Sequence, residues 1–142
     1  MRTLLALLTL ASAGLAAPVP KEIKETPREK LQGEWVIVSL DSGAGQQEQT
    51  GDFASFTLAI KGDKLTTNTS SGQGYKNETV VYDFAASPMR IDVHTGTSVT
   101  PGIFKFEDGK LYWCHAQQNA ARPTEFKGGD GRHCTIWKRA VK

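Results

Sequence analysis

The sequence lacks the short motifs that mark the commonest enzyme active sites. It has no Gly-x-Ser-x-Gly, His-Glu-x-x-His, Ser-x-x-Lys or Cys-x-x-Cys segment. The pairs Gly43-x-Gly45 and Gly72-x-Gly74 lack the third glycine and the following helix that a dinucleotide-binding loop needs. These absences favour binding over catalysis. An enzyme with an uncommon site stays open as an alternative.

An excess of one charge is also missing. The chain has 17 lysines and arginines against 15 aspartates and glutamates, which gives a formal net charge of +2. The charges are interspersed and form no basic stripe, whereas proteins that bind nucleic acid concentrate lysine and arginine on one surface. We therefore expect no nucleic-acid partner.

Long apolar runs are absent except at the N-terminus. A basic start at Arg2 precedes an apolar segment over 4–10 and a stretch of small residues over 11–17. This order is typical of a secretory signal peptide, with cleavage after Ala16 or Ala13, and the apolar segment is shorter than the roughly 20 residues that span a bilayer. A buried N-terminal helix is the alternative. We expect export to the periplasm, the cell envelope or the medium, and no membrane span in the mature chain.

A polar leader and one domain follow the predicted signal peptide, which covers residues 1–16. Residues 17–27 are rich in proline and charged side chains and indicate a flexible leader. The segment 26–29 (TPRE) has the pattern of a helix N-cap, with proline at the first helical position and a carboxylate at the third. We expect a helical turn over 28–31, ended by Gly33, at the start of a single domain over 28–142.

The rest of the domain shows β-strand patterns and no helical period. Apolar alternation and β-branched residues predict about eight short strands. Consecutive antiparallel strands favour an up-and-down β-barrel, which removes exposed sheet edges by closing; a two-sheet sandwich is the alternative. The segments 42–51 and 70–77 are expected to be solvated loops. The predicted strands are 34–40, 53–60, 64–68, 79–84, 89–93, 102–107, 110–115 and 133–140.

Cysteine is scarce, and its two copies are spaced to form one disulfide. Cys114 and Cys134 lie near the ends of two predicted strands that flank a long loop, and export permits a bridge. Two separate thiols are the alternative. Antiparallel pairing with Cys114 opposite Cys134 also sets the register of the neighbouring residues. It places His115 opposite His133, Trp113 opposite Thr135 and Leu111 opposite Trp137.

This register assigns the two faces of the strands. The face with Leu111, Trp113 and Trp137 is apolar and suits the interior, so the cysteines are expected on the other face. His115 and His133 then lie together where the two strands meet the loop. We expect them to be polar residues at the mouth of the barrel. A transition-metal site formed by the two imidazoles is the alternative.

Several segments resemble one protein family over residues 31–141. They are LQGEWVIVSL at 31–40, GIF at 102–104, GKLYWC at 109–114, RPTEF at 122–126 and WKR at 137–139. In this order they are similar to an uncharacterised lipocalin-like domain family that is abundant in planctomycete bacteria. The resemblance implies an eight-stranded lipocalin-like barrel and no particular activity.

The pair Gly33-x-Trp35 also resembles the first-strand signature of true lipocalins. That resemblance implies a tryptophan at the closed end of the barrel, covered by a basic residue from the last strand. Arg139 is placed for this role, and a guanidinium over an indole ring contributes about 0.5–2 kcal/mol. We expect Gly33, Trp35 and Arg139 to be structural.

Three further residues stand out in the long loop between the cysteines, where function concentrates on a rigid scaffold. We expect Arg122 and Glu125 to form an ion pair that holds the loop on the barrel, with Phe126 as its apolar plug. A ligand-gating or anion-binding Arg122 is the alternative.

The leading functional hypothesis is a non-catalytic barrel that holds a small apolar or amphipathic ligand. Eight-stranded barrels are either just wide enough for one small ligand or filled by side chains. An envelope or extracellular protein-interaction module with a solid core is the alternative, and the sequence identifies no protein partner. We expect no metal and no cofactor. The candidate ligand-binding residues are Phe104, Phe106, Trp113, His115, Arg122 and Trp137.

Overall fold

The computed structural model describes residues 24–50, 55–69, 71–72 and 74–141. The predicted signal peptide and most of the predicted leader lie outside these residues. Residues 24–26 have no regular structure and lead directly into a helix. No helix in the described part of the chain is long and apolar enough to cross a membrane.

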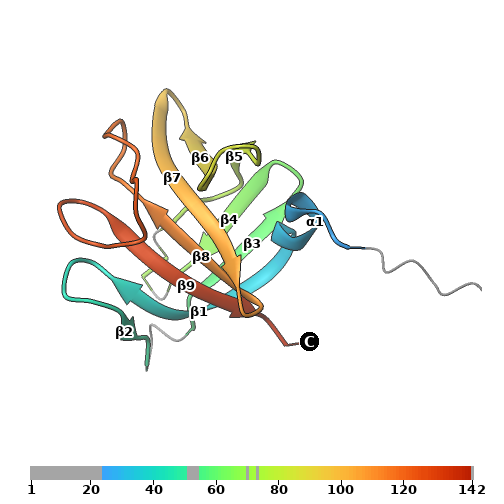
Figure 1. Ribbon diagram of the computed structural model, residues 1–142, viewed down its shortest axis with the longest axis horizontal. Helices are drawn as coiled ribbons and strands as arrows, with labels where there is room; N and C mark the ends of the chain where they lie inside the picture. The colour runs from blue at the N-terminus through green and yellow to red at the C-terminus, as the bar shows by residue number, and fades with distance from the viewer. Residues whose placement is uncertain (1–23, 51–54, 70, 73, 142) are drawn as a thin grey trace, which may run out of the picture.

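Helix α1 (Pro27–Leu31) forms as its capping sequence predicts. The Thr26 side chain accepts a hydrogen bond from the Glu29 amide, and the Glu29 carboxylate accepts one from the Thr26 amide at 2.8 Å. These two bonds satisfy amides that the start of a helix otherwise leaves without partners. Leu31 is fully buried, so the helix packs onto one end of the sheet (Figure 1).

The strands form one antiparallel sheet that closes on itself. They pair in the order β2-β1-β3-β4-β5-β6-β7-β8-β9, and β1 also pairs with β9. The closed ring contains eight strands, with β2 as an extra strand beside β1 (Figure 1). The up-and-down barrel is therefore confirmed, and the sandwich alternative is wrong because a sandwich would consist of two separate sheets. The strands are β1 (Gly33–Asp41), β2 (Gln47–Glu48), β3 (Thr57–Lys61), β4 (Lys64–Asn68), β5 (Glu78–Asp83), β6 (Met89–Thr95), β7 (Ser98–Glu107), β8 (Lys110–His115) and β9 (His133–Arg139).

Some strand boundaries differ from the prediction. Strand β2 lies inside a segment that was expected to be a solvated loop, because Glu48 pairs with Ser39 of β1. Strand β7 begins four residues before the predicted start and includes Pro101, although proline has no N–H to donate. The Pro101 carbonyl nevertheless accepts a hydrogen bond from the Ala116 amide at 3.0 Å. The described part of β3 begins at Thr57, later than predicted.

Strand β1 contains a bulge that changes which side chains face inward. Its register against β9 shifts by one residue at Val38. Before the shift, Trp35 and Ile37 belong to the barrel core. After the shift, Leu40 lines the interior and Asp41 stands on the outer side. Strict alternation from Trp35 would have brought Asp41 inside, so the bulge keeps a carboxylate out of the barrel.

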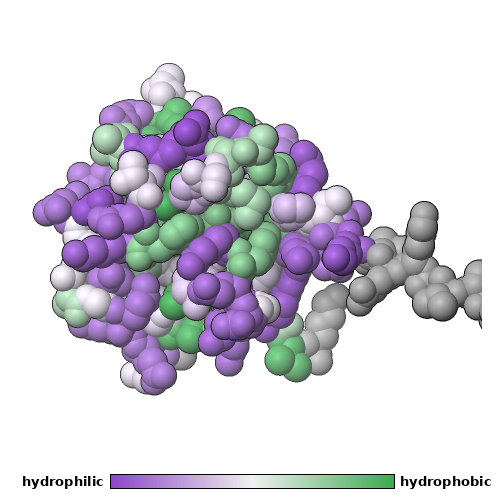
Figure 2. Space-filling model, in the orientation of Figure 1, coloured by the Kyte–Doolittle hydropathy of each residue, from purple (hydrophilic) through white to green (hydrophobic). Residues whose placement is uncertain are grey.

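The interior is filled by side chains in the half of the barrel next to α1. Leu58 and Phe104 are fully buried there. The Phe104 ring meets Phe84 and Phe106 edge to face, with ring centroids 6.0 and 5.9 Å apart. On the outside, hydrophobic side chains gather in the middle of the face that carries β7 and β9, with hydrophilic side chains around them (Figure 2).

Arg139 and Trp35 close the end of the barrel that α1 covers. The guanidinium carbon lies 4.1 Å from the centroid of the Trp35 ring, and the guanidinium donates to the carbonyls of Gln32 and Lys30. A Cβ atom at Gly33 would lie 2.7 Å from Arg139 Nη1, and the φ of +110° at this position also favours glycine. All three residues of this signature thus pack against one another at the closed end.

The disulfide belongs to a second apolar cluster on the outer face of the barrel. Cys114 and Cys134 are bonded and buried, and they pack with Ile103. Phe126 of the long loop covers this cluster, which is the position expected for an apolar plug. Every cross-strand pair expected around the two cysteines is present. The disulfide and the register are thus confirmed.

Removal of the disulfide should lower stability without changing the fold. The bridge joins residues 20 positions apart, and the chain-entropy model gives about 3 kcal/mol for a loop of this size. We expect the double variant Cys114→Ala/Cys134→Ala to lose a free energy of unfolding of that order, measured by urea denaturation with circular dichroism. Reduced wild-type protein is the matched control because it keeps both sulfur atoms. Unchanged midpoints in both samples would contradict the prediction.

Candidate functional site

A cavity of about 240 Å³ lies at the end of the barrel opposite α1. Its lining includes the last residue of β8, His115, and the first of β9, His133. The long loop that joins these two strands lies at the same end of the barrel (Figure 1). Its walls are mainly apolar and aromatic, as is usual for a small-molecule pocket. The described residues that line it are Ile37, Leu40, Phe56, Thr57, Thr67, Asn68, Thr69, Tyr75, Trp113, His115, His133, Thr135 and Trp137.

Three aromatic rings give the cavity a rigid wall. Trp137 Nε1 donates to the Thr135 hydroxyl at 2.7 Å, and that hydroxyl donates to the Trp113 carbonyl at 3.1 Å. The Tyr75 ring lies against Trp113, with centroids 6.3 Å apart. Because Trp113 and Trp137 stand on paired strands and the indole of Trp137 is anchored by a hydrogen bond, these rings are held in fixed positions.

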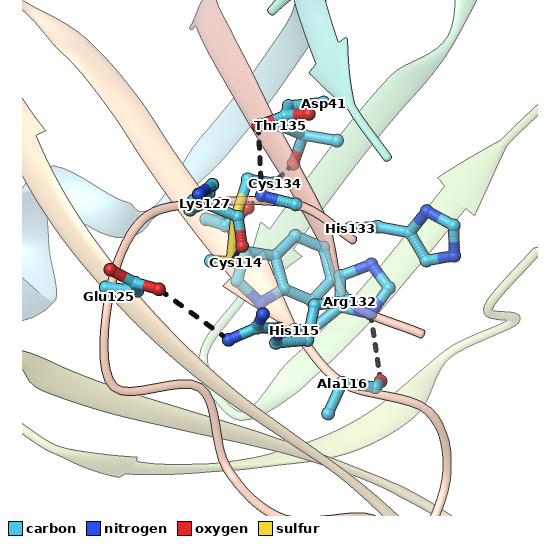
Figure 3. Close-up of a disulfide and its surroundings, with 12 residues drawn as sticks. Asp41, Cys114, His115, Ala116, Glu125, Lys127, Arg132, His133, Cys134 and Thr135 are labelled. Atoms are coloured by element: carbon cyan, nitrogen blue, oxygen red, sulfur yellow. Dashed lines mark hydrogen bonds and ion pairs between the residues drawn. A yellow bond between two sulfur atoms is a disulfide. The ribbon is translucent and has the colours of Figure 1, made fainter. Parts of the chain in front are cut away.

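Two histidines stand side by side at this end. Their ring centroids are 5.7 Å apart, and both rings lie on the side of the strands away from the disulfide (Figure 3). His115 Nδ1 donates to the Ala116 carbonyl at 3.2 Å, since a carbonyl oxygen can only accept. Burial lowers the pKa of His115 to about 4, so the ring is neutral at pH 7. No group of three or more metal-ligating side chains occurs among the described residues, and two imidazoles alone form a weak site.

Of the six candidate ligand-binding residues, Trp113, His115 and Trp137 line the cavity. Phe104 and Phe106 do not. Phe104 is fully buried in the filled half of the barrel, and Phe106 contacts Trp35 at the closed end with ring centroids 6.2 Å apart. Alternation assigned both rings to the inner face, but it carries no information about their distance from the mouth.

Arg122 does not point into the cavity. It forms a two-pronged ion pair with Asp92 of β6, with Nη2 2.8 Å from Oδ2, and it donates to the Gly102 carbonyl at 2.8 Å. Asp92 lies between two core residues of β6, so the pair is on the outer face. The expected partner was Glu125, which instead lies 4.0 Å from Arg132. The loop is therefore held on the barrel by Arg122, as expected, but through a different carboxylate.

Asp41 organises the loops around the mouth and was not identified from the sequence. Its carboxylate accepts hydrogen bonds from the amides of Gly43, Gly45 and Gly128 at 2.8, 3.0 and 3.0 Å. These bonds, led by that from Gly128, lower the pKa of Asp41. Gly128 is required because a Cβ there would lie 2.1 Å from the Asp41 carbonyl oxygen. A single carboxylate thus connects the loop after β1 with the loop before β9.

Several lining residues also escaped the sequence analysis. Leu40 faces the cavity only because of the bulge at Val38. Tyr75 lies in a segment that was expected to be a solvated loop, yet its amide donates to the Thr67 hydroxyl at 2.8 Å and its ring packs against the core. An aromatic residue inside a Gly- and Ser-rich loop was the available signal for Tyr75. No local signal marks the bulge.

Comparisons with known proteins do not assign a family. No family model and no curated protein matches the chain. Among solved structures, the crystal structure of a mutant of the fluorescent protein UnaG is similar, with a TM-score of 0.44 and 16% sequence identity over 80% of this chain and 99% of that chain.

The neutral state of His115 predicts a pH-dependent stability. Its pKa is about 4 in the folded protein against 6.5 for an unperturbed histidine, so the unfolded state binds the proton first as the pH falls. As the pH falls from neutrality to about 4, His115 should therefore lower the free energy of unfolding by as much as about 3 kcal/mol.

Urea unfolding at several pH values measures this effect. The variant His115→Gln should show a much smaller decrease over the same range, whereas His94→Gln, on another strand, should behave as the wild type does. If the free energy of unfolding depended on pH equally in all three proteins, the pH dependence could not be assigned to His115. Glu29 and Asp41, whose pKa values are lowered by their hydrogen bonds in the folded protein, also reduce stability as the pH falls into the range where the unfolded carboxylates take up protons. All three proteins share this loss, so the difference between His115→Gln and the wild type isolates His115.

Proposed function

We propose that this chain is an exported, non-catalytic lipocalin-like protein that holds a small apolar or amphipathic molecule at the open end of its barrel. The cavity beside Trp113, Trp137 and Tyr75 is the observation that carries the proposal. Its volume of about 240 Å³ lies just below the roughly 300–1,000 Å³ of drug-sized pockets. The ligand is therefore expected to be small.

The lining of the cavity supports binding rather than catalysis. Its described titratable side chains are Tyr75, His115 and His133, and none of the described lining residues is a carboxylate, lysine or arginine. His115 is held by the Ala116 carbonyl through Nδ1. General acid–base chemistry commonly pairs groups of different protonation state around one reacting atom. An apolar wall with a neutral imidazole at His115 suits retention of a ligand better.

Export is supported by two independent features. The N-terminal sequence has the order of a signal peptide. The Cys114–Cys134 disulfide is of the kind that persists in oxidising compartments. The resemblance of residues 31–141 to a lipocalin-like bacterial family supports the same class of protein.

Ligand binding is tested with N-phenyl-1-naphthylamine, an uncharged probe whose fluorescence increases in an apolar site. The wild type should bind it. The variant Leu40→Trp places a large ring in the cavity and should weaken binding about tenfold or more, a loss of about 1.4 kcal/mol. The matched control Val81→Trp adds the same ring at a position that is 52% exposed, and it should bind as the wild type does.

Thermal unfolding of both variants verifies that the barrel is intact. Equal affinities of Leu40→Trp and wild type would show that the probe binds outside the cavity. Absence of binding to the wild type would contradict the proposal and favour a protein-interaction module instead.

Export predicts a shortened N-terminus. When the full sequence is expressed in a bacterium, the periplasmic protein should begin at Ala17 or Gly14, which Edman sequencing and intact mass determine. The control Leu7→Arg interrupts the apolar segment and should leave an uncleaved chain in the cytoplasm. An uncleaved cytoplasmic wild-type chain would contradict export.

A further inference from the structure

We infer that a groove on the outer side of the barrel binds a short peptide segment of a partner protein, in which apolar side chains stand next to acidic ones. This groove is separate from the cavity at the mouth, so the inference goes beyond the proposed function. It is carried by two adjoining hollows between the β5–β6 turn and the long loop, one mainly apolar and the other lined by two guanidinium groups.

The groove has two walls and a floor. Residues 86–90, at the β5–β6 turn and the start of β6, form one wall, and residues 122–124 and 126 of the long loop form the other. Residues 103–105 of β7 form the floor. The two hollows have volumes of about 400 and 420 Å³ and share Ser87 and Pro88. They therefore form one continuous surface, which we call the outer groove.

Contacts within the protein already hold both walls of the outer groove in place. The Asp83 carboxylate accepts hydrogen bonds from the amides of Ala85 and Ala86, both at 3.1 Å, and so fixes the turn. In the other wall, Arg122 is fixed by its ion pair on β6, and Phe126 packs on the cluster around the disulfide. A preformed groove loses little conformational freedom when a partner binds.

The apolar half of the groove is recessed. Ala86, Pro88 and the half-buried ring of Phe126 line it. The large hydrophobic side chains that are exposed in the described part of the chain are Val81 and Val141, and neither lies in the groove. A protein that docks on a bilayer inserts apolar side chains into it, whereas a recessed apolar surface suits a side chain that a partner protein inserts.

The charge of the groove favours an acidic partner. The charged side chains that line it are Arg90, Lys105 and Arg122, and no carboxylate is among its described lining residues. Two of these cations already have partners, since Arg122 is paired with Asp92 and the Lys105 ammonium lies 3.3 Å from Glu107. The third cation is therefore the one that a partner can engage.

Arg90 is this available cation. It is exposed and forms no ion pair with any described residue. Asp83 lies opposite Arg90 on β5, but its Oδ1 accepts from two backbone amides. A guanidinium can bind one carboxylate through two parallel N–H···O bonds. A peptide that places a carboxylate at Arg90 and an apolar side chain against Phe126 therefore uses both halves of the groove.

Four fluorescein-labelled peptides test this chemistry. GSLFEEGS and GSEEFLGS carry apolar and acidic residues in the two possible directions, GSLFQQGS lacks the charge, and GSEEGGGS lacks the apolar side chains. Their affinities are measured by fluorescence anisotropy at about pH 7.5 and low salt. We expect at least one of the first two to bind about five- to tenfold more tightly than either control peptide, and high salt to reduce its advantage over GSLFQQGS by screening.

A pair of substitutions tests the residue assignment. Arg90→Gln should reduce the affinity of the tighter acidic peptide to about that of GSLFQQGS. The matched control is Lys138→Gln, which removes the same charge at an exposed position of β9 that does not line the groove. It should leave the preference for the acidic peptide unchanged. Both substituted side chains are exposed, so both variants should fold as the wild type does.

A spectroscopic measurement locates the peptide without any variant. In the ¹⁵N-labelled wild type, saturation with the tighter acidic peptide should move the backbone amide signals of the groove residues over 86–90, 103–105 and 122–126. The signals of His115 and His133 at the mouth should stay in place.

The outcomes are decisive for the outer groove and leave the mouth cavity to its own test. Equal affinities of all four peptides, an unchanged acidic preference in Arg90→Gln, or signal changes only outside the groove would overturn the inference. Binding to phosphatidylglycerol vesicles that requires Arg90, without binding of any peptide, would overturn it in favour of a membrane surface. N-Phenyl-1-naphthylamine should bind the wild type and Arg90→Gln equally, so failure of the inference does not affect the proposed function.

Discussion

The structure depends on the pairing of β1 with β9, which joins the two ends of the domain and closes the barrel. This ladder runs from Trp35 opposite Arg139 to Asp41 opposite Cys134. At its first end it places a guanidinium on an indole under α1. At its far end the bulge at Val38 turns Leu40 inward and Asp41 outward. The pairing of β1 with β9 thus positions the residues that cover the closed end of the barrel. It also determines which side chains of β1 face the cavity at the open end.

The interior is filled by side chains next to α1 and leaves a cavity at the other end. Trp35 and Phe106 are in ring contact near α1, whereas Thr67 and Thr135 occupy inner positions beside the rings at the mouth. An eight-stranded barrel has little spare width, so its interior is either filled by side chains or holds one small molecule. On the outer face, the disulfide and the Arg122–Asp92 pair hold the long loop in place and stabilise the rim of this space.

Much of the candidate site could be predicted where one observation determined a register. Placing Cys114 opposite Cys134 brought Trp113, His115 and Trp137 to the inner face, since residues two apart on a strand share a face. The same rule assigned Phe104 to that face but not to a depth in the barrel. For Arg122, the nearby Glu125 was the obvious partner in sequence, whereas the actual partner Asp92 is 30 positions away. This large separation in sequence is why the Arg122–Asp92 ion pair was not predicted.

The sequence by itself determined the features that depend on short-range patterns. These are the capped turn of α1, the alternating strands and the turn positions. The closing pair of Trp35 and Arg139 was expected only from the resemblance to lipocalins. Only the tertiary structure decided the bulge at Val38, the three amides from which Asp41 accepts, and the Trp113 N–H, which has no acceptor among the described residues. Each of these depends on how strands from distant parts of the chain are aligned and on which polar groups find a partner, and local residue preferences do not specify either.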